Sequence, residues 1–122
     1  MLAIARKRAH RLGLSITLAE MNAETLDFPD HSFDTVVDTL AVCTFPDPVA
    51  VLREMARVCR SDGRLLLLEH GRSDRDWLGR WQDRHAGRHA ERLCCHWNRE
   101  PLDLVRQGVG GGLQLLGERS VM

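Results

Sequence analysis

The 122-residue chain carries 17 basic and 17 acidic side chains, so its formal net charge is zero, and 43% of its residues are apolar. A chain of this length forms one domain at most, and its composition is that of a globular protein rather than a disordered one. The balanced charge gives no reason to expect nucleic acid or an acidic membrane as a bulk partner. No run approaches the roughly 18 apolar residues of a membrane span.

The N-terminal residues and the cysteines indicate an intracellular protein. The basic segment of residues 1–14 lacks the apolar core of a secretory signal. The four cysteines show no paired spacing, and a bridge between the adjacent Cys94 and Cys95 would be strained. We therefore expect a reducing compartment, either cytoplasmic or organellar.

The first predicted elements are a helix and a strand. Apolar residues at helical spacing in Met1–Leu12 predict a helix with one buried stripe, ended by Gly13. Weak alternation over Ser15–Met21 predicts a strand. Asn22, Ala23 and Glu24 come next, and on these residues alone a helix start capped by Asn22 is the plain interpretation.

Residues 33–70 are predicted to form two strands joined by a helix. Phe33–Leu40 and Leu65–Leu68 do not alternate, which indicates strands that are buried on both faces of a parallel sheet. A parallel pair needs a crossover of about a dozen residues, usually helical, and the amphipathic run Val49–Arg60 supplies one. Ser61–Gly63 is predicted to be a turn, with Gly63 at positive φ.

Polar residues gather where both predicted strands end. Asp38 and the segment Thr39–Cys43 close the first strand, and Glu69 and His70 close the second. Ligands bind outside the carboxyl ends of the strands in open α/β sheets, so Asp38 is expected near a ligand. His70 is the candidate general base because imidazole titrates near neutral pH, with Glu69 to orient it. A plain surface strand end is the alternative for this pair.

The segment 71–100 is rich in tryptophan and histidine. His85 and His89 share one face of a helix, but the paired spacings of a structural zinc site are absent, so we predict no metal. We expect an amphipathic helical insertion here. Trp77 and Trp81 share a face of it, and tryptophan beside arginine suits peripheral contact with a membrane surface.

The last segments are a helix and a glycine-rich tail. Arg99–Gln107 is predicted to be a short helix with Pro101 in its first turn. Gly108–Gly112 is a flexible breaker and not a phosphate loop, because no Lys-Ser/Thr pair follows it. Leu113–Leu116 is expected to form at most a stub of strand.

Two motifs flank the central strand. Asn22–Asp34 reads NAETLDFPDHSFD, and Leu52–Gly63 reads LREMARVCRSDG. Together they resemble the second half of a class I S-adenosylmethionine-dependent methyltransferase of the type 11, methyltransferase-like branch. Glu69-His70 and the later Trp-Gln-Asp and Asn-Arg-Glu runs are similar to that branch as well. The resemblance extends over roughly residues 1–107.

The resemblance implies an α/β, Rossmann-like class I methyltransferase fold with a partial parallel sheet that lacks the first two strands. Residues 1–107 would be the C-terminal portion of the methyltransferase domain, with a core of 1–70 and a helical cap of 71–100, and 108–122 would be an atypical tail. It also implies S-adenosylmethionine as the cofactor and a small-molecule methyl acceptor. The implied cofactor-binding residues are Asn22, Ala23, Asp38, Thr39, Leu40 and Cys43.

Asn22 stands where the family usually has an aspartate that accepts a hydrogen bond from the adenine amino group. An amide oxygen can accept the same bond, so adenine binding and a plain helix cap both stay open at this position.

The family's main cofactor motifs do not occur in this sequence. These are a Gly-rich loop after the first strand and an acid after the second, and we expect the chain to be N-terminally truncated and to bind the cofactor weakly or not at all. The open edge of Phe33–Asp38 is expected to pair with Ser15–Met21, to form a homodimer, or to leave the chain partly molten.

Two functions therefore remain. The first is S-adenosylmethionine-dependent methyl transfer to an unidentified acceptor, or an inactive fragment of such an enzyme. The alternative is a non-catalytic Rossmann-like interaction or dimerisation module. Zinc or nucleic-acid binding through the His/Cys/Arg segment is the least favoured interpretation.

Overall fold

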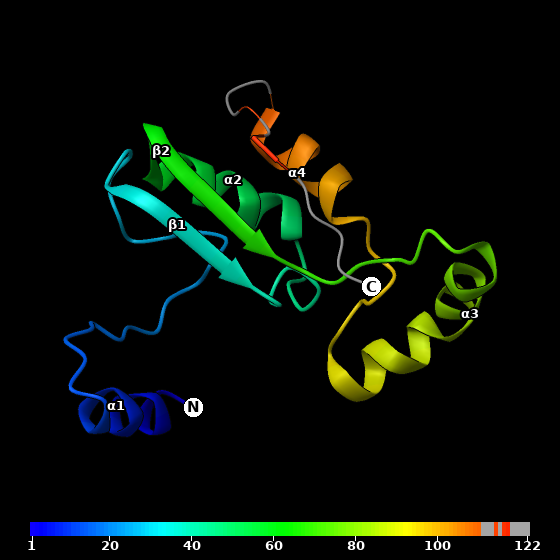
Figure 1. Cartoon of the computed structure of the whole chain (residues 1–122), viewed down its shortest axis with the longest axis horizontal. Helices are drawn as coiled ribbons and strands as arrows, with labels where there is room; N and C mark the ends of the chain where they lie inside the picture. The colour runs from blue at the N-terminus through cyan, green and yellow to red at the C-terminus, as the bar shows by residue number, and fades with distance from the viewer. Residues whose placement is uncertain (111–113, 115, 118–122) are drawn as a thin grey trace.

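The structure is a computed structural model that describes residues 1–110, 114, 116 and 117. Its elements are the helices α1 (Leu2–Arg11), α2 (Pro48–Val58), α3 (Asp76–Leu93) and α4 (Pro101–Val109), and the strands β1 (Phe33–Thr39) and β2 (Cys59–Leu68) (Figure 1). β1 and β2 form a two-stranded parallel sheet, and α2 is the crossover between them. The predicted strand–helix–strand unit and the partial parallel sheet are confirmed.

Local residues set one end of each of three helices, and two of these, Gly13 and Pro101, were predicted from the sequence. Asp47 caps α2, because its Oδ1 accepts a hydrogen bond of 3.0 Å from the Ala50 N–H, and Pro48 occupies the first turn. Pro101 likewise opens α4. α1 ends just before Gly13, whose φ of 64° is the left-handed conformation that glycine favours.

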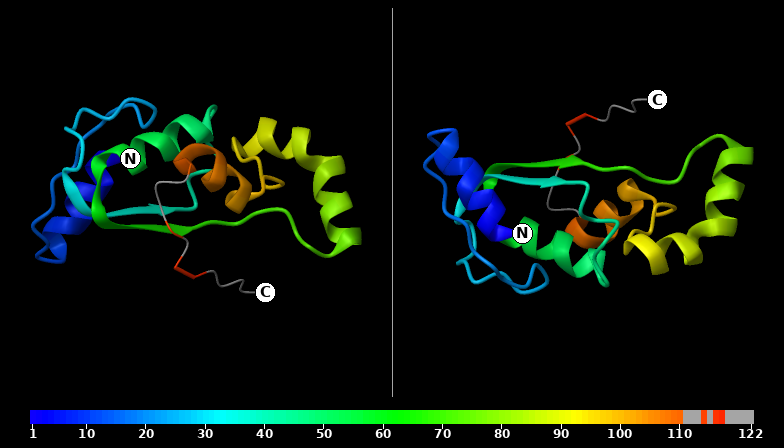
Figure 2. Two further views of the ribbon diagram at one scale, coloured as in Figure 1. Left: turned by 90° about the horizontal axis from the view of Figure 1, so that it is seen from above. Right: turned by 90° about the horizontal axis from the view of Figure 1, so that it is seen from below.

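The core lies between α2, α4 and one face of the sheet. Figure 2 shows both helices on the same side of the strands. Gly108 lets α4 come close to α2, since a Cβ at this position would lie 2.8 Å from Leu52 Cβ. The buried residues of the core are Val42, Val51, Leu52 and Met55, and they are packed by Val36, Leu65 and Leu67 from the strands and by Leu104 and Val105 from α4.

The other face of the sheet is exposed, so the prediction of strands buried on both faces is wrong. Val37, Leu66 and Leu68 point to this face and are 62%, 51% and 63% exposed. Burial alternates along both strands, because α2 packs on one face and no helix or strand of the described residues covers the other.

Ser15–Met21 is not a strand, in contrast to the prediction. The segment has no regular secondary structure, and no strand of the described chain lies beside it to accept its hydrogen bonds. The helix predicted over Met1–Leu12 does form, but its apolar stripe has no partner. Ala9 is buried while Leu12 is exposed, and α1 packs against no other helix or strand of the described residues.

The second strand begins six residues earlier than the predicted Leu65. Phe33 pairs with Cys59 and Thr35 pairs with Arg64, so the residues between form a bulge rather than the predicted turn. Gly63 is not among the described glycines with positive φ. Its small size is needed for a different reason, because a Cβ here would lie 2.8 Å from the Asp34 carbonyl oxygen.

The remaining predicted helices form, and the tail is largely untested. α3 supplies the expected helical insertion, and α4 the expected short helix. None of the helices in the described part of the chain is long and apolar enough to span a membrane. The predicted strand stub at Leu113–Leu116 includes residues outside the described ones, as does most of the tail over 108–122.

Arg57 clamps the loop before β1 onto α2. Its guanidinium donates to the Phe28 and Leu26 carbonyl oxygens at 2.9 and 3.0 Å, and it pairs with Asp30 at 2.6 Å and with Glu54 at 2.7 Å. Glu54 in turn accepts the Leu26 N–H at 2.9 Å. The two sequence motifs therefore lie against each other in the structure, one in the loop before β1 and the other in α2.

Acid should weaken this clamp in a defined pH range. Hydrogen bonds from Arg57, and then the Leu26 N–H, lower the pKa of Glu54 from 4.5 to about 2. Because the folded-state pKa is the lower one, Glu54 stabilises the fold fully above its unfolded pKa, and this stabilisation is lost as the pH falls from about 4.5 towards 2. In urea denaturation, we expect the free energy of unfolding to fall across this range, and the fall to be smaller in Glu54→Gln.

Asp103→Asn is the matched control, because Asp103 forms an exposed ion pair three residues from Arg106 on α4. This variant should keep the slope of the wild-type chain. Equal slopes in the wild-type chain and in Glu54→Gln would contradict the role given to the clamp.

Candidate functional site

Two carboxyl groups meet at the carboxyl edge of the sheet. Asp38 pairs in register with Leu67 on β2, and Glu69 directly follows the end of β2 at Leu68. Burial, followed by the neighbouring carboxyl group of Asp38, raises the pKa of Glu69 to about 7.

One oxygen of each carboxyl group in this pair accepts no hydrogen bond from the described residues. Asp38 Oδ2 and Glu69 Oε2 are buried and receive no hydrogen bond from an N–H or O–H donor of the described chain. Glu69 Oε1, in contrast, accepts the Ala41 N–H at 3.0 Å. A buried acceptor without a donor is costly, which makes this edge suited to a group that brings a positive charge or donors.

The loop after β1 carries backbone strain. Leu40 has a φ of 54°, in the left-handed region that branched side chains rarely adopt, and its N–H still pairs with the Leu68 carbonyl at 2.8 Å. The structure brings the predicted residues Asp38, Thr39 and Leu40 together at the edge. Thr39 and Leu40 are exposed there, whereas Cys43 is only 3% exposed, behind the loop.

The structure also places Ala23 and Glu24 next to this loop. Ala23 packs against the cluster that contains Val42, and Glu24 accepts the Asp47 N–H at 3.3 Å. Asn22 Oδ1 accepts the Glu24 N–H at 3.0 Å, which is turn chemistry and not the predicted helix start. Adenine binding by Asn22 stays a prediction, as do the cofactor contacts of the other predicted residues.

His70 lies at the same edge, in a cluster with two cysteines that the sequence did not suggest. Its Nε2 is 3.4 Å from Cys95 Sγ, and Cys95 Sγ is 3.4 Å from Cys43 Sγ. Both cysteines are free thiols, and burial, followed by Cys95, raises the pKa of the Cys43 thiol. The role of His70 as a general base stays a prediction, and the carboxylate of Glu69 bonds to Ala41 rather than to this imidazole.

The connection from α3 to α4 holds the cluster together. His96 donates its N–H to the Cys43 carbonyl at 2.8 Å. Arg99 Nη1 donates to the Val42 and Phe45 carbonyls at 2.6 and 2.9 Å, so this guanidinium closes the loop that carries Cys43. Burial lowers the pKa of Arg99. The Arg72 N–H, just past β2, pairs with the Arg99 carbonyl at 2.9 Å.

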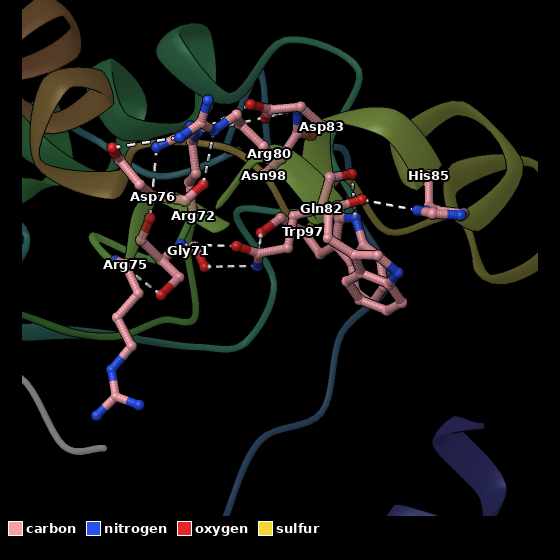
Figure 3. A network of polar contacts seen from close by, with 12 residues as sticks. Gly71, Arg72, Arg75, Asp76, Arg80, Gln82, Asp83, His85, Trp97 and Asn98 are labelled. Atoms are coloured by element: carbon pink, nitrogen blue, oxygen red, sulfur yellow. Dashed lines mark hydrogen bonds and ion pairs between the residues drawn. The ribbon is translucent and has the colours of Figure 1, made fainter. Parts of the chain in front are cut away.

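Figure 3 shows the contacts of α3 with the segment that precedes it, residues 71–73, and with the segment that follows it, residues 97 and 98. Gln82 accepts the Ser73 N–H at 2.7 Å and donates to the Gly71 and Trp97 carbonyls. Asp83 binds both Arg72 and Asn98 (Figure 3). Because these contacts join the chain on either side of α3, the positions of His70 and Cys95 are coupled.

The histidines of α3 have aromatic partners and lie apart from the cysteine cluster. His89 stacks on Trp97 with ring centroids 3.9 Å apart, and the His85 ring nitrogen contacts the Trp81 carbonyl at 2.8 Å. Trp81 packs against Trp97, while Trp77 is 68% exposed. The contacts described for His85 and His89 are thus with tryptophan residues. The sequence carries no spacing motif for the group of Cys43, His70 and Cys95. Its only sequence signal is that Cys43 and His70 follow the carboxyl ends of two parallel strands.

The parallel crossover unit and its polar carboxyl edge define a Rossmann-like α/β domain. The profile of the family described as "Methyltransferase domain" matches residues 1–67, and the chain belongs to this family. It is 44% identical over 77 residues to phosphatidylethanolamine N-methyltransferase of Cereibacter sphaeroides, covering 62% of this chain and 38% of that protein.

A second curated relative and a solved structure are similar to the chain as well. The chain is 38% identical over 85 residues to the ubiquinone/menaquinone biosynthesis C-methyltransferase UbiE of Pseudoalteromonas translucida, covering 68% of this chain and 34% of that protein. An S-adenosylmethionine-dependent methyltransferase structure from Thermotoga maritima matches with a TM-score of 0.64 and 26% identity, covering 88% of this chain and 49% of that one. The chain thus spans about a third of the length of these curated relatives. The predicted family and fold are confirmed, and these matches imply S-adenosylmethionine as the cofactor.

Proposed function

We propose that this chain forms the carboxyl-edge part of an S-adenosylmethionine-dependent methyltransferase site. The observation that carries the proposal is the pair Asp38 and Glu69, whose buried, donor-free oxygens lie at the ligand side of a parallel strand–helix–strand unit. S-adenosylmethionine carries an ammonium and a sulfonium group, so its charge fits such acceptors. The family match over residues 1–67 supports the same assignment.

Each predicted residue has a defined part in this proposal. Asn22 and Ala23 face the adenine, since Asn22 Oδ1 accepts one hydrogen bond and retains a second lone pair. Asp38 holds the positive charge of the amino-acid part, and Thr39 and Leu40 form the wall beside it. Cys43 supports this wall from behind, because it is buried.

When bound, S-adenosylmethionine supplies a methyl group on a sulfonium sulfur, which an acceptor takes by in-line displacement, leaving S-adenosylhomocysteine. The chain's own residues orient the two partners and keep water away, and for such a displacement these effects provide most of the acceleration. The strained Leu40 and the tied connection through Arg99 hold the loop in one shape.

The acceptor that we propose is a lipophilic small molecule. The names of two relatives specify phosphatidylethanolamine and ubiquinone or menaquinone biosynthesis, and all of these compounds reside in membranes. The exposed Trp77 on α3 is consistent with peripheral membrane contact, which stays a prediction.

Binding of S-adenosylhomocysteine, measured by titration calorimetry, tests the proposal. We expect saturable binding with a Kd in the roughly millimolar range, which corresponds to about 4 kcal/mol, because the described edge offers few contacts. Asp38→Asn should weaken binding by about tenfold or more through loss of a charge-assisted hydrogen bond.

Asp34→Asn is the matched control, since Asp34 is an exposed carboxylate at the opposite end of the same strand. This variant should bind like the wild-type chain. If both substitutions weakened S-adenosylhomocysteine binding equally, the placement of the cofactor at the carboxyl edge of the sheet would be contradicted.

The alternative is a non-catalytic dimerisation module, and the exposed sheet face of Val37, Leu66 and Leu68 favours it. Its occupant would be a second copy of the chain, paired through the open edge of β1. Absence of S-adenosylhomocysteine binding, together with a molar mass that doubles with concentration in light scattering, would support this module against methyl transfer.

A further inference from the structure

We propose that Cys43, His70 and Cys95 form a binding site for Zn²⁺, with two thiolates and one imidazole as ligands. The sequence predicted no metal, but the three ligand atoms all lie within 4.8 Å of one another. Nothing in the family match or in the relatives' names assigns a metal to these residues. The inference goes beyond the proposed methyl transfer and does not depend on it.

The distances within the cluster fit tetrahedral zinc. With Zn–S near 2.3 Å and Zn–N near 2.0–2.1 Å, tetrahedral ligand atoms are separated by about 3.5–3.8 Å. The Cys43 and Cys95 sulfurs are 3.4 Å apart, and His70 Nε2 is 3.4 Å from Cys95 Sγ. When a cation binds, the two sulfurs would move apart by a few tenths of an ångström. Cys43 Sγ and the His70 nitrogen, which lie within 4.8 Å of each other, would adjust to the tetrahedral spacing. Two thiolates would neutralise the charge of the cation.

The ligands come from three different segments that the fold already fixes. Cys43 lies in the loop after β1, His70 follows β2, and Cys95 follows α3. His96 binds the Cys43 carbonyl, and Arg72 binds the Arg99 carbonyl, so the residues next to the ligands are held by the backbone. A site assembled in the folded chain loses little conformational entropy when the metal binds.

The number of ligands leaves one position open. Three protein ligands with a water or substrate atom in the fourth position are the usual arrangement of catalytic zinc, including two cysteines with one histidine. Cys43 is buried whereas His70 and Cys95 are half-buried, so one side of the cluster is closed by protein. His70 would act here as a ligand and not as the general base predicted from the sequence.

A disulfide between Cys43 and Cys95 is the competing chemistry. The sulfurs would have to approach from 3.4 Å to about 2.05 Å, and the bond would make no use of His70. The contact of the imidazole with Cys95 favours the metal, because neutral imidazole and thiolate together are the preferred ligands of Zn²⁺.

The test is titration of the full chain, kept reduced and free of cofactor, with Co²⁺ as a spectroscopic substitute. We expect one equivalent to give a thiolate-to-cobalt charge-transfer band and the visible bands of tetrahedral cobalt, and Zn²⁺ to remove both. Cys43→Ser, Cys95→Ser and His70→Gln should each weaken binding by at least about tenfold. Cys94→Ser and His96→Gln are the matched controls, since they neighbour the ligands without belonging to the cluster.

A second measurement needs no variant and therefore does not depend on whether the variants fold. Alkylation with iodoacetamide, read by mass spectrometry, should show Zn²⁺ protecting Cys43 and Cys95 and leaving the exposed Cys94 reactive. No charge-transfer band, equal protection of Cys94, or a Cys43–Cys95 disulfide that persists in reducing buffer would overturn the proposal.

Discussion

Replacing Leu52 with alanine should lower the free energy of unfolding by about 3 kcal/mol, within the roughly 2–5 kcal/mol seen for buried Leu→Ala changes. Leu52 has no exposed surface and lies in the cluster that joins α2, α4 and the sheet. The substitution removes buried methyl groups and leaves a cavity at the centre of a small core. Such a loss is a large part of the 5–15 kcal/mol that stabilises a typical domain. Urea denaturation followed by circular dichroism measures it.

Leu66→Ala is the matched control for this change. Leu66 lies on β2, and half of its surface is exposed on the uncovered face of the sheet. We expect this variant to lose less than about 1 kcal/mol, because most of the removed surface is already in water. A loss as large as that of Leu52→Ala would show that the open face is covered in solution, and would contradict the described core.

The second large effect concerns Gly108, where alanine should destabilise the chain by about 1–3 kcal/mol. The new Cβ would lie 2.8 Å from Leu52 Cβ and 3.0 Å from the Val49 carbonyl oxygen, so α4 would have to move away from α2. Because both neighbours belong to the packed helix α2, neither can rotate out of the way. The shift in the thermal midpoint and the urea midpoint measures the effect.

Gly87→Ala provides a control of the opposite sign. Gly87 lies inside α3, and a Cβ there would meet nothing within 4 Å. Alanine is favoured over glycine in a helix interior by about 0.8–1 kcal/mol, so this variant should be slightly stabilised. If both substitutions stabilised the chain, the close contact of α4 with α2 would be refuted.

Much of the fold could be predicted because local sequence determines it. Asp47 and Pro48 mark the start of α2, Pro101 marks the start of α4, and Gly13 marks the end of α1. These residues act through their own backbone and nearest neighbours, so their effect does not depend on the rest of the chain. The ligand-side edge was also predictable, because parallel strands place their carboxyl ends together.

The predictions that were wrong concern features that depend on contacts between residues far apart in the sequence. Ser15–Met21 has strand-forming residues but no neighbouring strand in the described chain, and Leu66 has an apolar side chain but no helix above it. The bulge before Arg64 depends on its register with β1 rather than on local turn chemistry. Propensity alone cannot supply these partners.

The candidate site likewise depends on contacts that the sequence alone does not reveal. Asp38 and Glu69 were predicted individually, but the raised pKa of Glu69 follows from burial that only the assembled edge provides. Cys43 and Cys95 are 52 residues apart in sequence, and no spacing rule connects them. The tied segments around α3 bring them together, and those contacts join residues far apart in the chain.

The most direct test of the central claim is a titration of the isotope-labelled chain with S-adenosylhomocysteine, followed residue by residue through backbone amide resonances. We expect saturable shifts concentrated at Asn22, Ala23 and the segment from Asp38 to Ala41, with the resonances of α3 and α1 unchanged. This pattern would place the cofactor at the carboxyl edge of β1 and β2. Shifts confined to α3, or no saturable shift at millimolar ligand, would contradict the proposed methyltransferase site.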